Sequence, residues 1–429
     1  MLRTHYSQDV DAKNYGSTIT VAGWIEDIRN LGGIAFLILR DKTGKIQVTA
    51  LKKENPELFK ELVSLPRETV VSITGLCQEN TQVMNNWEIL PQHVHILSLA
   101  ESPLPLGVID KVGADFDTTL DNRFIDLRKK ENHAIFSIRD AFLTATHNFL
   151  HSQGFLEIHT PKITTTSPEG GTEVFSLQYF DRQAYLVQSP QLYKQIMMST
   201  GFDCVYEIAW YFRAEEHDTS RHLNESTAID VEMAFIESEE DIMKMAENLI
   251  QHIMTHLITQ KKSDLDILSI FPEVPPTPFP RITYDEALDL IKKKTDMNWG
   301  DDFGTLEERI IGESLEETFY FITKYPLETK PFYSMPNGKY ARSFDLSYRG
   351  VEIASGAQRI HQYDLLKRRM AHMSMDIDNF SDYLKAFRYG MPPHGGFGFG
   401  IERFLMELLQ LGNIRKCILF PRDRTRLSP

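Results

Sequence analysis

The sequence predicts a mixed α+β protein in which a small β-barrel precedes a larger domain with a central antiparallel sheet flanked by helices. Three observations predict this fold. The 429 residues are more than one ordinary hydrophobic core accommodates. Residues 18–98 are rich in strand patterns and contain one short helix. Beyond residue 126, long amphipathic helices alternate with short strands.

The first domain is expected over residues 1–100. Its elements are three strands, a helix and two further strands, at 18–28, 35–41, 46–51, 55–65, 68–78 and 87–100. This is the order of elements in a five-stranded OB-fold barrel, a fold that often binds oligonucleotides. The order alone does not separate it from other small barrels.

Residues 101–125 carry proline, glycine and charge without periodicity, and we expect a linker there. The second domain is expected over 126–429. Core-facing stripes at helical spacing predict helices around 135–149 and 239–259. Strand patterns follow at 205–213, 226–236, 341–355 and 395–400. After the proline-rich stretch 271–280, a charged helical insertion is expected at about 281–328.

Composition narrows the functional classes. A formal net charge of −14 disfavours a protein that coats nucleic acid non-specifically, without excluding local contacts. No run of about 18 apolar residues predicts a membrane span, and the start has no apolar signal-like region. The three cysteines are far apart, which argues against a disulfide framework or a zinc ribbon. We therefore expect a cytoplasmic protein with no membrane partner.

Four clusters of residues could carry chemistry. The hairpin YFRAEEHDTSRHLNE (211–225) holds Arg213, Glu215, Arg221 and His222, and arginine forks suit phosphate oxygens. A charged surface hairpin is the alternative reading. The strand FGFGIERF (397–404) leaves room for a flat ligand before Arg403, although a tightly packed strand would look the same.

The other two clusters are an acidic pair and a loop. Asp345 and Glu352 are separated by the turn SYRG, and their hard oxygens suit Mg²⁺ on a triphosphate unless both are solvated. The glycine-containing loop SPEGGTEVF (167–175) could close over a ligand, but most such loops are only flexible surface segments.

The stretch SPQLYKQIM (189–197) contains a lysine in apolar surroundings. Ser189 and Pro190 are typical of a helix start, and Leu192 and Ile196 are spaced to face a core. A single lysine such as Lys194 usually lies on a solvated helix face.

Taken together, these motifs resemble those of a known family. GFLEIHTPKI (154–163), YFRAEEHDTSRHLNE and GFGFGIERF resemble the three ordered motifs of class II aminoacyl-tRNA synthetases. A barrel in front of them resembles the subgroup IIb enzymes that charge aspartate, asparagine or lysine. SPQLYKQ, SPEGGTE, FDLSYRGVEIASGAQRIH and LFPRDRTRLSP resemble the archaeal and eukaryotic type of aspartyl-tRNA synthetase.

The resemblance implies roles for the phosphate-binding residues. ATP is expected to contact six residues: Arg213, Glu215, Arg221, His222, Glu352 and Arg403. Arg213 would hold the α-phosphate and Arg403 the γ-phosphate, and these two arginines are the expected catalytic residues. Mg²⁺ would be held by Asp345, Glu352 and Ser355. Positioned cations of this kind stabilise the charge that develops during phosphoryl transfer.

The resemblance also implies an aspartate site formed by Glu169, Gln191, Lys194, Asp230, Ser355 and Arg359. Asp230 would pair with the substrate ammonium, and Arg359 with Lys194 would grip the side-chain carboxylate. A neutral amide would leave one cation unpaired, at a cost of about 1.5–3 kcal/mol or more. We therefore expect L-aspartate as the amino acid, and expect Lys194→Leu to impair its activation far more than stability.

The expected partners are tRNA(Asp), ATP and L-aspartate, and the product would be esterified at the tRNA 3′-OH. Anticodon bases are expected to contact Arg29, Phe36 and Gln47, because barrels of this kind stack splayed bases on aromatic rings. A barrel-core role for Phe36 stays open. Pro161 matches a dimer-interface position, which implies a homodimer.

Other functions stay open. The nearest alternative is an enzyme that charges both tRNA(Asp) and tRNA(Asn), and an asparaginyl enzyme is a weaker one. A synthetase paralogue that makes an amino acid, or an OB-fold RNA-binding protein without catalysis, is disfavoured by the presence of the barrel, Arg213 and Arg403 together.

Two positions depart from the resemblance. Ser226 follows the loop glutamate where many relatives have an aromatic residue that stacks on adenine, and Trp210 stands where a proline is expected.

Overall fold

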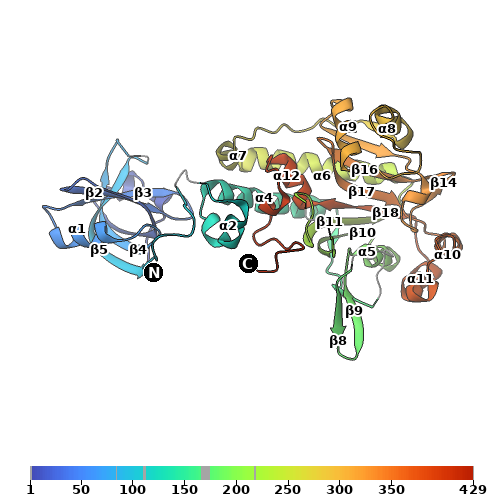
Figure 1. The fold of residues 1–429 in the computed structure, drawn as a ribbon, viewed down its shortest axis with the longest axis horizontal. Helices are drawn as coiled ribbons and strands as arrows, with labels where there is room; N and C mark the ends of the chain where they lie inside the picture. The colour runs from blue at the N-terminus through green and yellow to red at the C-terminus, as the bar shows by residue number, and fades with distance from the viewer. Residues whose placement is uncertain (1, 84, 110–112, 166–173, 217–218, 429) are drawn as a thin grey trace. The chain divides into compact units, whose positions relative to one another are not determined.

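The computed structural model describes all residues except 1, 84, 110–112, 166–173, 217–218 and 429. The chain divides into two compact units, Met1–Asp126 and Leu127–Pro429, and each is described by itself (Figure 1). Within the described residues, no helix combines the length and the apolar character that crossing a membrane requires.

The first unit contains a closed five-stranded barrel with strand order β1-β2-β3-β5-β4. Its elements are β1 (Thr18–Asn30), β2 (Ile34–Arg40), β3 (Lys45–Leu51), α1 (Pro56–Ser64), β4 (Val70–Glu79) and β5 (Trp87–Ser98). Each strand alternates buried and more exposed side chains, with Ile25, Leu37 and Val48 in the core. The predicted OB-fold order of elements is therefore confirmed.

Local chemistry explains the helices of this unit. Asn55 caps α1 by accepting a hydrogen bond from Leu58 N at 3.0 Å, and Pro56 takes the first helical position. The end of the expected linker is helical, since α2 (Phe116–Asp121) and α3 (Arg123–Asp126) follow Asp115. The Asp115 carboxylate accepts from Thr118 N at 2.8 Å, so it starts α2 as an N-cap.

The second unit is built on an eight-stranded sheet with strand order β12-β13-β16-β17-β18-β11-β10-β6. The strands are β6 (Leu156–Glu157), β10 (Cys204–Phe212), β11 (Glu225–Ala234), β12 (Arg281–Thr283), β13 (Phe319–Thr323), β16 (Ser343–Tyr348), β17 (Val351–Gln358) and β18 (His394–Gly400). The two outermost pairs are parallel and all the pairs between them are antiparallel.

Two small sheets accompany the main one. The first has the order β7-β9-β8 and contains β7 (Ile163–Thr164), β8 (Ser176–Tyr179) and β9 (Arg182–Leu186). The second pairs β14 (Pro336–Asn337) with β15 (Tyr340–Ala341).

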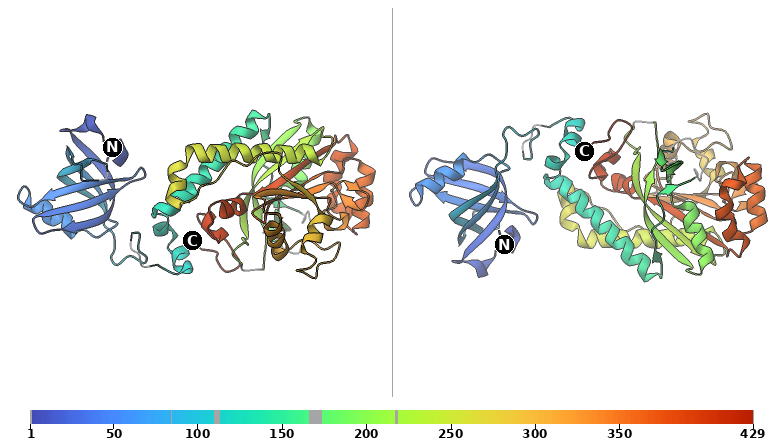
Figure 2. Two further views of the ribbon diagram at one scale, coloured as in Figure 1. Left: turned by 90° about the horizontal axis from the view of Figure 1, so that it is seen from above. Right: turned by 90° about the horizontal axis from the view of Figure 1, so that it is seen from below.

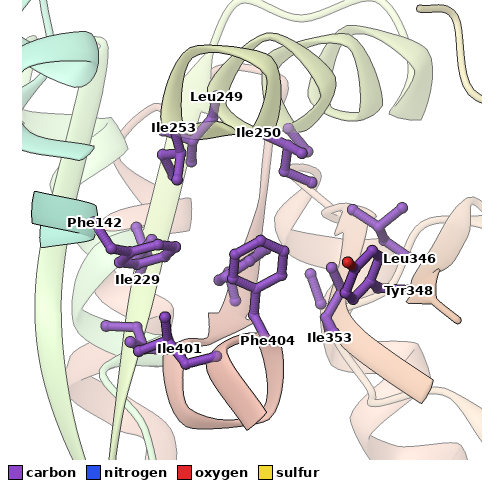
Figure 3. Close-up of a cluster of buried hydrophobic side chains, with 14 of the residues drawn as sticks. Phe142, Ile229, Leu249, Ile250, Ile253, Leu346, Tyr348, Ile353, Ile401 and Phe404 are labelled. Atoms are coloured by element: carbon purple, nitrogen blue, oxygen red, sulfur yellow. The ribbon is translucent and has the colours of Figure 1, made fainter. Parts of the chain in front are cut away.

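Long helices cover one face of the main sheet. These are α4 (Lys130–Ser152) and α6 (Glu239–Gln260), with the shorter α7 (Lys262–Leu268) and α12 (Ile401–Leu408) beside them (Figures 1 and 2). Phe142 of α4, Ile253 of α6 and Phe404 of α12 meet side chains of the sheet in one buried cluster (Figure 3). This core holds the strands in a fixed register. Polar side chains on the opposite face of the sheet are therefore held in fixed positions as well.

Three further helices form a second apolar cluster with the loop before β14. They are α5 (Gln191–Met197), α10 (Tyr363–His372) and α11 (Ser381–Arg388). The helix α5 begins one residue after the expected Pro190, because Pro190 occupies the cap position. Ser189 Oγ still accepts from Gln191 N at 3.3 Å, as its place at the helix start predicts.

The insertion at about 281–328 was expected to be helical, and this is wrong in part. It contains α8 (Tyr284–Ile291) and α9 (Thr305–Leu315), but also β12 and β13, which belong to the main sheet. The sequence of β13, FYFIT, is buried at every position. A strand buried on both faces has no alternating pattern, so periodicity alone does not reveal it.

Candidate active site

The neighbouring strands β11 and β18 of the main sheet separate the core from a polar face. On β11, Ile229 and Val231 belong to the core, whereas Asp230 and Glu232 alternate with them and point to the other side. Opposite these acids in the antiparallel register stand two glycines of β18, Gly398 beside Asp230 and Gly396 beside Glu232.

These two glycines are needed because a side chain at either position would collide with or crowd its neighbours, and not because the strand has to be flexible. A Cβ at Gly396 would overlap the Glu232 carboxylate and the Val231 carbonyl, and a Cβ at Gly398 would lie 3.1 Å from Tyr211 Oη. The glycine-rich sequence of β18 is thus required by the close approach of buried polar side chains.

A cavity of about 360 Å³ opens on this polar face. It is lined by several predicted site residues: Gln191, Arg213, Glu215, Arg221, His222, Asp230, Glu352, Ser355, Arg359 and Arg403. These residues come from α5, the loop between β10 and β11, β11 itself, β17 with the residue after it, and the start of α12. The structure therefore brings together residues more than 200 positions apart in one cavity.

Several arginines line the cavity, among them Arg213, Arg221 and Arg403. Arg213 directly follows β10, and its backbone is fixed by Asn224, since Arg213 N donates to Asn224 O at 2.9 Å and Asn224 Nδ2 donates back to Arg213 O at 2.8 Å. Glu215 lies 3.7 Å from His222 Nε2 across the same loop. The loop is thereby held by its own contacts, with its charged groups facing the cavity.

Buried contacts of Glu402 hold the first turn of α12 in place. Glu402 is buried and accepts from Thr227 Oγ1 at 2.6 Å, and it also pairs with Arg139 of α4 at 2.7 Å. This places the next residue, Arg403, in the cavity wall, where its Nη1 donates to Glu352 O at 3.3 Å. Anchored arginines lose little further entropy when they bind an anion.

Carboxylates gather beside Arg403. Asp345 of β16 pairs with Lys330 at 2.8 Å, and Glu308 of α9 accepts from Glu352 N at 3.4 Å. Burial raises the pKa of Glu308 to about 7, and the Glu352 charge adds to this. Burial and the nearby Asp345 likewise raise the pKa of Glu352. Glu308 and Glu352 therefore have too little positive charge nearby to offset the effect of burial on their pKa values.

The same group fits a hard cation. Oδ1 of Asp345 is buried and has no hydrogen-bond partner among the described residues, which suits an oxygen ligand. Ser355 stands directly opposite Asp345 in the strand register. Glu352 lines the cavity between them and Arg403, so the residues expected to hold Mg²⁺ are compatible with that ion. Glu308 was not predicted from the sequence.

A chain of four buried charges lies beside the cavity, and two of them, Asp230 and Arg359, line it. Lys194 Nζ lies 2.9 Å from Asp230 Oδ1 and 3.5 Å from Glu232 Oε2. Glu232 also accepts from Arg359 Nε at 3.0 Å and from its Nη2 at 3.2 Å. Although burial opposes ionisation, Arg359 and Lys194 hold the pKa of Glu232 below its usual value.

The position of Lys194 differs from the expected one. Its side chain is only 2% exposed and does not line the cavity, because its ammonium is covered by both acids and by the carbonyls of Val231 and Phe397. Lys194 is therefore neither a lysine on a solvated helix face nor a cation that points straight at a ligand. Both interpretations from the sequence are corrected. Arg359 is the cation of this group that reaches the cavity.

Glu232 was missed in the sequence. It lies two residues after Asp230 on a strand, so the two share a face, and this spacing was the available signal. Tyr211 was also missed, and it donates from its hydroxyl to Asp230 Oδ2 at 2.6 Å. Asp230 is thus held from two sides before any ligand binds.

Gln191 lines the cavity, and its Nε2 is buried without a hydrogen-bond partner among the described residues. An unpaired buried donor suits a ligand oxygen. Glu169, the remaining residue of the expected aspartate site, lies outside the described residues, as does most of the loop 167–175.

The departures from the family pattern fall at different places. Ser226 lines the cavity, so the aromatic ring expected there is replaced by a small hydroxyl. Trp210 is 47% exposed on β10 and is not among the lining residues.

In the barrel, Arg29 and Phe36 are direct neighbours across β1 and β2. Phe36 is half-buried between the fully buried Ala35 and Leu37, so it lies on the outer face and is no barrel-core phenylalanine. Gln47 is half-buried on β3 and donates to Glu88 at 3.0 Å. Pro161 of the second unit is exposed.

Comparison with known proteins agrees with this architecture. Residues 115–424 match the family model of class II tRNA synthetases (D, K and N), and residues 19–97 match that of the OB-fold nucleic acid binding domain. The chain belongs to the class II aminoacyl-tRNA synthetases.

Full-length relatives identify the branch. The chain is 49% identical over 438 residues to the aspartate–tRNA(Asp) ligase of Thermococcus kodakarensis, with 100% of both chains covered. It is also 49% identical to the aspartate–tRNA(Asp/Asn) ligase of Methanosarcina barkeri, covering 100% of this chain and 99% of the relative. Within its class, it is therefore an archaeal-type aspartyl-tRNA synthetase.

The fold recurs in an enzyme for a different amino acid. The asparaginyl-tRNA synthetase of Pyrococcus horikoshii, solved with asparaginyl-adenylate, superposes with a TM-score of 0.92 at 31% identity, with 100% of both chains covered. Amino-acid choice within this fold consequently depends on individual side chains rather than on the backbone.

Proposed function

We propose that this protein activates L-aspartate with ATP to form aspartyl-adenylate and then transfers the aspartyl group to the 3′-OH of tRNA(Asp). One observation carries the proposal. A single cavity is lined both by Arg213 and Arg403, which suit phosphate, and by Asp230 and Arg359, which offer opposite charges. An amino acid and a nucleoside triphosphate can react only when one cavity binds both, and this lining suits both.

The choice of aspartate follows from charge balance. Lys194 and Arg359 carry two positive charges, and Asp230 and Glu232 carry two negative ones. The ammonium and side-chain carboxylate of aspartate add one charge of each sign, so the buried group stays neutral. Asparagine would add only the ammonium, leaving an uncompensated positive charge in a site where a charged hydrogen bond contributes about 1.5–3 kcal/mol.

Each residue has a separate task in this proposal. Asp230 receives the substrate ammonium, and Arg359 receives the side-chain carboxylate. Lys194, being buried, neutralises Asp230 and Glu232 and fixes their positions, so it is a positioning residue. Gln191 and Ser355 supply hydrogen bonds from the cavity wall, and Glu169 is proposed to contribute from its loop.

The adenylation step needs no general base, because the α-carboxylate of the substrate attacks the α-phosphorus already ionised. A carboxylate oxygen forms the new P–O bond as the bond to pyrophosphate breaks. Arg213 would stabilise charge on the α-phosphate, and Arg403 the departing γ-phosphate. Glu215, Arg221 and His222 would hold the adenine side and the phosphate tail from the loop.

Asp345, Glu352 and Ser355 are the residues proposed to hold Mg²⁺, with Glu308 next to them. Bound Mg²⁺ supplies charge neutralisation to the triphosphate. The raised pKa values of Glu308 and Glu352 support this assignment, and so does the buried Asp345 oxygen that has no hydrogen-bond partner among the described residues, because each indicates an acid that is short of a cation.

The barrel is proposed to hold the anticodon through Arg29, Phe36 and Gln47. The outward ring of Phe36 beside a basic side chain supports stacking on a splayed base. Relatives of equal identity differ in their tRNA, one being named for tRNA(Asp) and the other for tRNA(Asp/Asn). Charging of tRNA(Asn) as well is therefore the second candidate function.

A homodimer through the surface around Pro161 and a cytoplasmic location complete the proposal. The exposed Pro161 next to the exposed apolar residues Leu156 and Ile163 supports the dimer. The free state of Cys77, Cys204 and Cys417 agrees with a reducing compartment.

The test is aminoacylation by the full-length protein with ATP, Mg²⁺ and labelled L-aspartate, using purified tRNA(Asp) and tRNA(Asn) in parallel. Charging of tRNA(Asp) alone supports the first function, and comparable charging of both supports the second. Failure to charge either, by a preparation shown to be folded, would overturn both.

A further inference from the structure

A second cluster of ligand-type side chains lies where the last turns of α4 meet β6 and β10. His147 and His151 are four residues apart on α4 and therefore share one face of the helix. Glu157 of β6 follows after the turn at Gly154, which has a φ of +82°. One ligand atom from each of the three residues lies within 4.8 Å of the other two. Among the described residues, no other cluster meets this criterion.

The three side chains converge on one buried hydroxyl. Tyr206 Oη of β10 lies 2.8 Å from His147 Nδ1, 3.0 Å from His151 Nε2 and 3.1 Å from Glu157 Oε2. Tyr206 is 1% exposed and so has a fixed position. Burial and the Glu157 charge raise the pKa of its hydroxyl, which therefore keeps its proton and donates to the carboxylate.

We propose that His147, His151 and Glu157 form a binding site for a divalent transition-metal ion such as Zn²⁺ or Co²⁺. Two imidazole nitrogens and one carboxylate oxygen are a ligand set that Zn²⁺ accepts, with a fourth position for water. Mg²⁺ prefers an all-oxygen shell, so the site is chemically separate from that of the nucleotide.

The geometry needs only a small adjustment. Bonds of about 2.0–2.1 Å in a tetrahedron place ligand atoms about 3.3 Å apart. His147 Nδ1 and Glu157 Oε2 are already 3.4 Å apart. His151 is exposed, so its ring can move toward them. Each imidazole would bind through a lone pair and carry its proton on the other nitrogen.

Tyr206 takes the part of a positioning residue. Its hydroxyl holds Glu157 by a hydrogen bond, as partners of ligating carboxylates commonly do. A bound ion would join the end of α4 to β6 and β10. Since metal that binds only the folded state stabilises it, the melting temperature should rise with metal concentration.

The test uses the full-length protein, stripped with a chelator and then titrated with Co²⁺ in the presence of excess Mg²⁺. We expect one Co²⁺ per chain, the visible absorption of a low-coordinate Co²⁺–histidine site, and a rise in melting temperature. The exposed His151→Ala variant should fold and keep aspartate-dependent exchange, while its Co²⁺ affinity falls at least about tenfold.

A matched control exists on α6, where His252 and His256 are also four residues apart but have no third ligand of this kind among the described residues. His256→Ala should bind Co²⁺ like the unchanged protein. Tyr206→Phe should bind about 10–100-fold more weakly. Absence of the absorption band, or equal Co²⁺ affinity in His151→Ala, would overturn the site and leave a hydrogen-bonded network around Tyr206.

Discussion

Lys194 Nζ lies 2.9 Å from Asp230 Oδ1, and both side chains are only 2% exposed. The pair connects α5 to β11. Glu232 extends it to Arg359, so four charges from three segments of the chain neutralise one another beneath the cavity. Removing any one of them leaves a partner unpaired in a poorly solvated place.

Lys194→Met should therefore lower both stability and aspartate activation. Asp230 loses its counter-ion and Glu232 keeps only Arg359, and breaking a comparable buried pair costs about 3–5 kcal/mol of unfolding free energy. This replaces the expectation from the sequence that Lys194→Leu would impair activation far more than stability. Denaturant unfolding and aspartate-dependent exchange measure the two effects.

The matched control is Lys385→Met, since Lys385 is exposed and pairs with Asp382 on the surface. It should unfold like the unchanged protein. Adding Asp230→Asn to Lys194→Met should recover part of the lost stability, because one of the stranded charges is then gone. If the losses of unfolding free energy from the two substitutions simply add, the pairing of Lys194 with Asp230 is contradicted.

Gly396→Ala should destabilise the second unit by about 1–3 kcal/mol or more, because its Cβ would overlap the Glu232 carboxylate and the Val231 carbonyl. Gly33 of the barrel has open space around its Cβ position and a φ outside the left-handed range, so Gly33→Ala should change stability by less than about 1 kcal/mol. Thermal unfolding compares the two. An equal loss of stability in both variants would show that close packing does not require a glycine at position 396.

His394 should make stability depend on pH. Burial lowers its pKa to about 4, and its Nδ1 lies 2.9 Å from Pro392 O. The unfolded chain binds the proton near pH 6.5, so stability is complete above that pH and falls as the pH drops toward 4. The loss is about 3 kcal/mol. Denaturant unfolding between pH 4 and 7 measures it.

His394→Gln removes this titration and should flatten the pH dependence of unfolding over that range. The exposed His133→Ala serves as the control and should retain the full dependence. A His394→Gln variant with the same slope as the unchanged protein would assign the effect to other groups.

Phe36→Ala should weaken tRNA charging while leaving aspartate-dependent exchange unchanged. Loss of one base stacked on an aromatic ring costs about 1–3 kcal/mol, or about 5–150-fold in kcat/KM for tRNA. Tyr15 is also exposed on the barrel unit and lies before β1, so Tyr15→Ala is the control. A drop in exchange activity with Phe36→Ala would place the ring outside tRNA recognition.

Local patterns were sufficient to predict the framework. The barrel was predicted because its strands alternate along their length, and α4 and α6 because their apolar residues recur at helical spacing. The strand β13 was not predicted, since FYFIT is apolar throughout and carries no period. Helical propensity in the flanking charged segments extended the predicted insertion over it.

The site shows the same limit. Arg213 and Arg403 were predicted because their motifs are short and ordered along the chain. The surroundings of Lys194 were not, because they depend on residues 37 and 203 positions away. Burial of a charge is set by such distant contacts, which no local pattern contains. Glu308 was missed for this reason, whereas Glu232 had a local signal in its spacing two residues after Asp230.

The most direct measurement of the central claim is ATP–pyrophosphate exchange by the full-length protein with Mg²⁺, comparing L-aspartate with L-asparagine. The charge balance of Lys194, Asp230, Glu232 and Arg359 predicts exchange that depends on L-aspartate, with L-asparagine at least about tenfold less effective. Exchange supported equally by L-asparagine would contradict it.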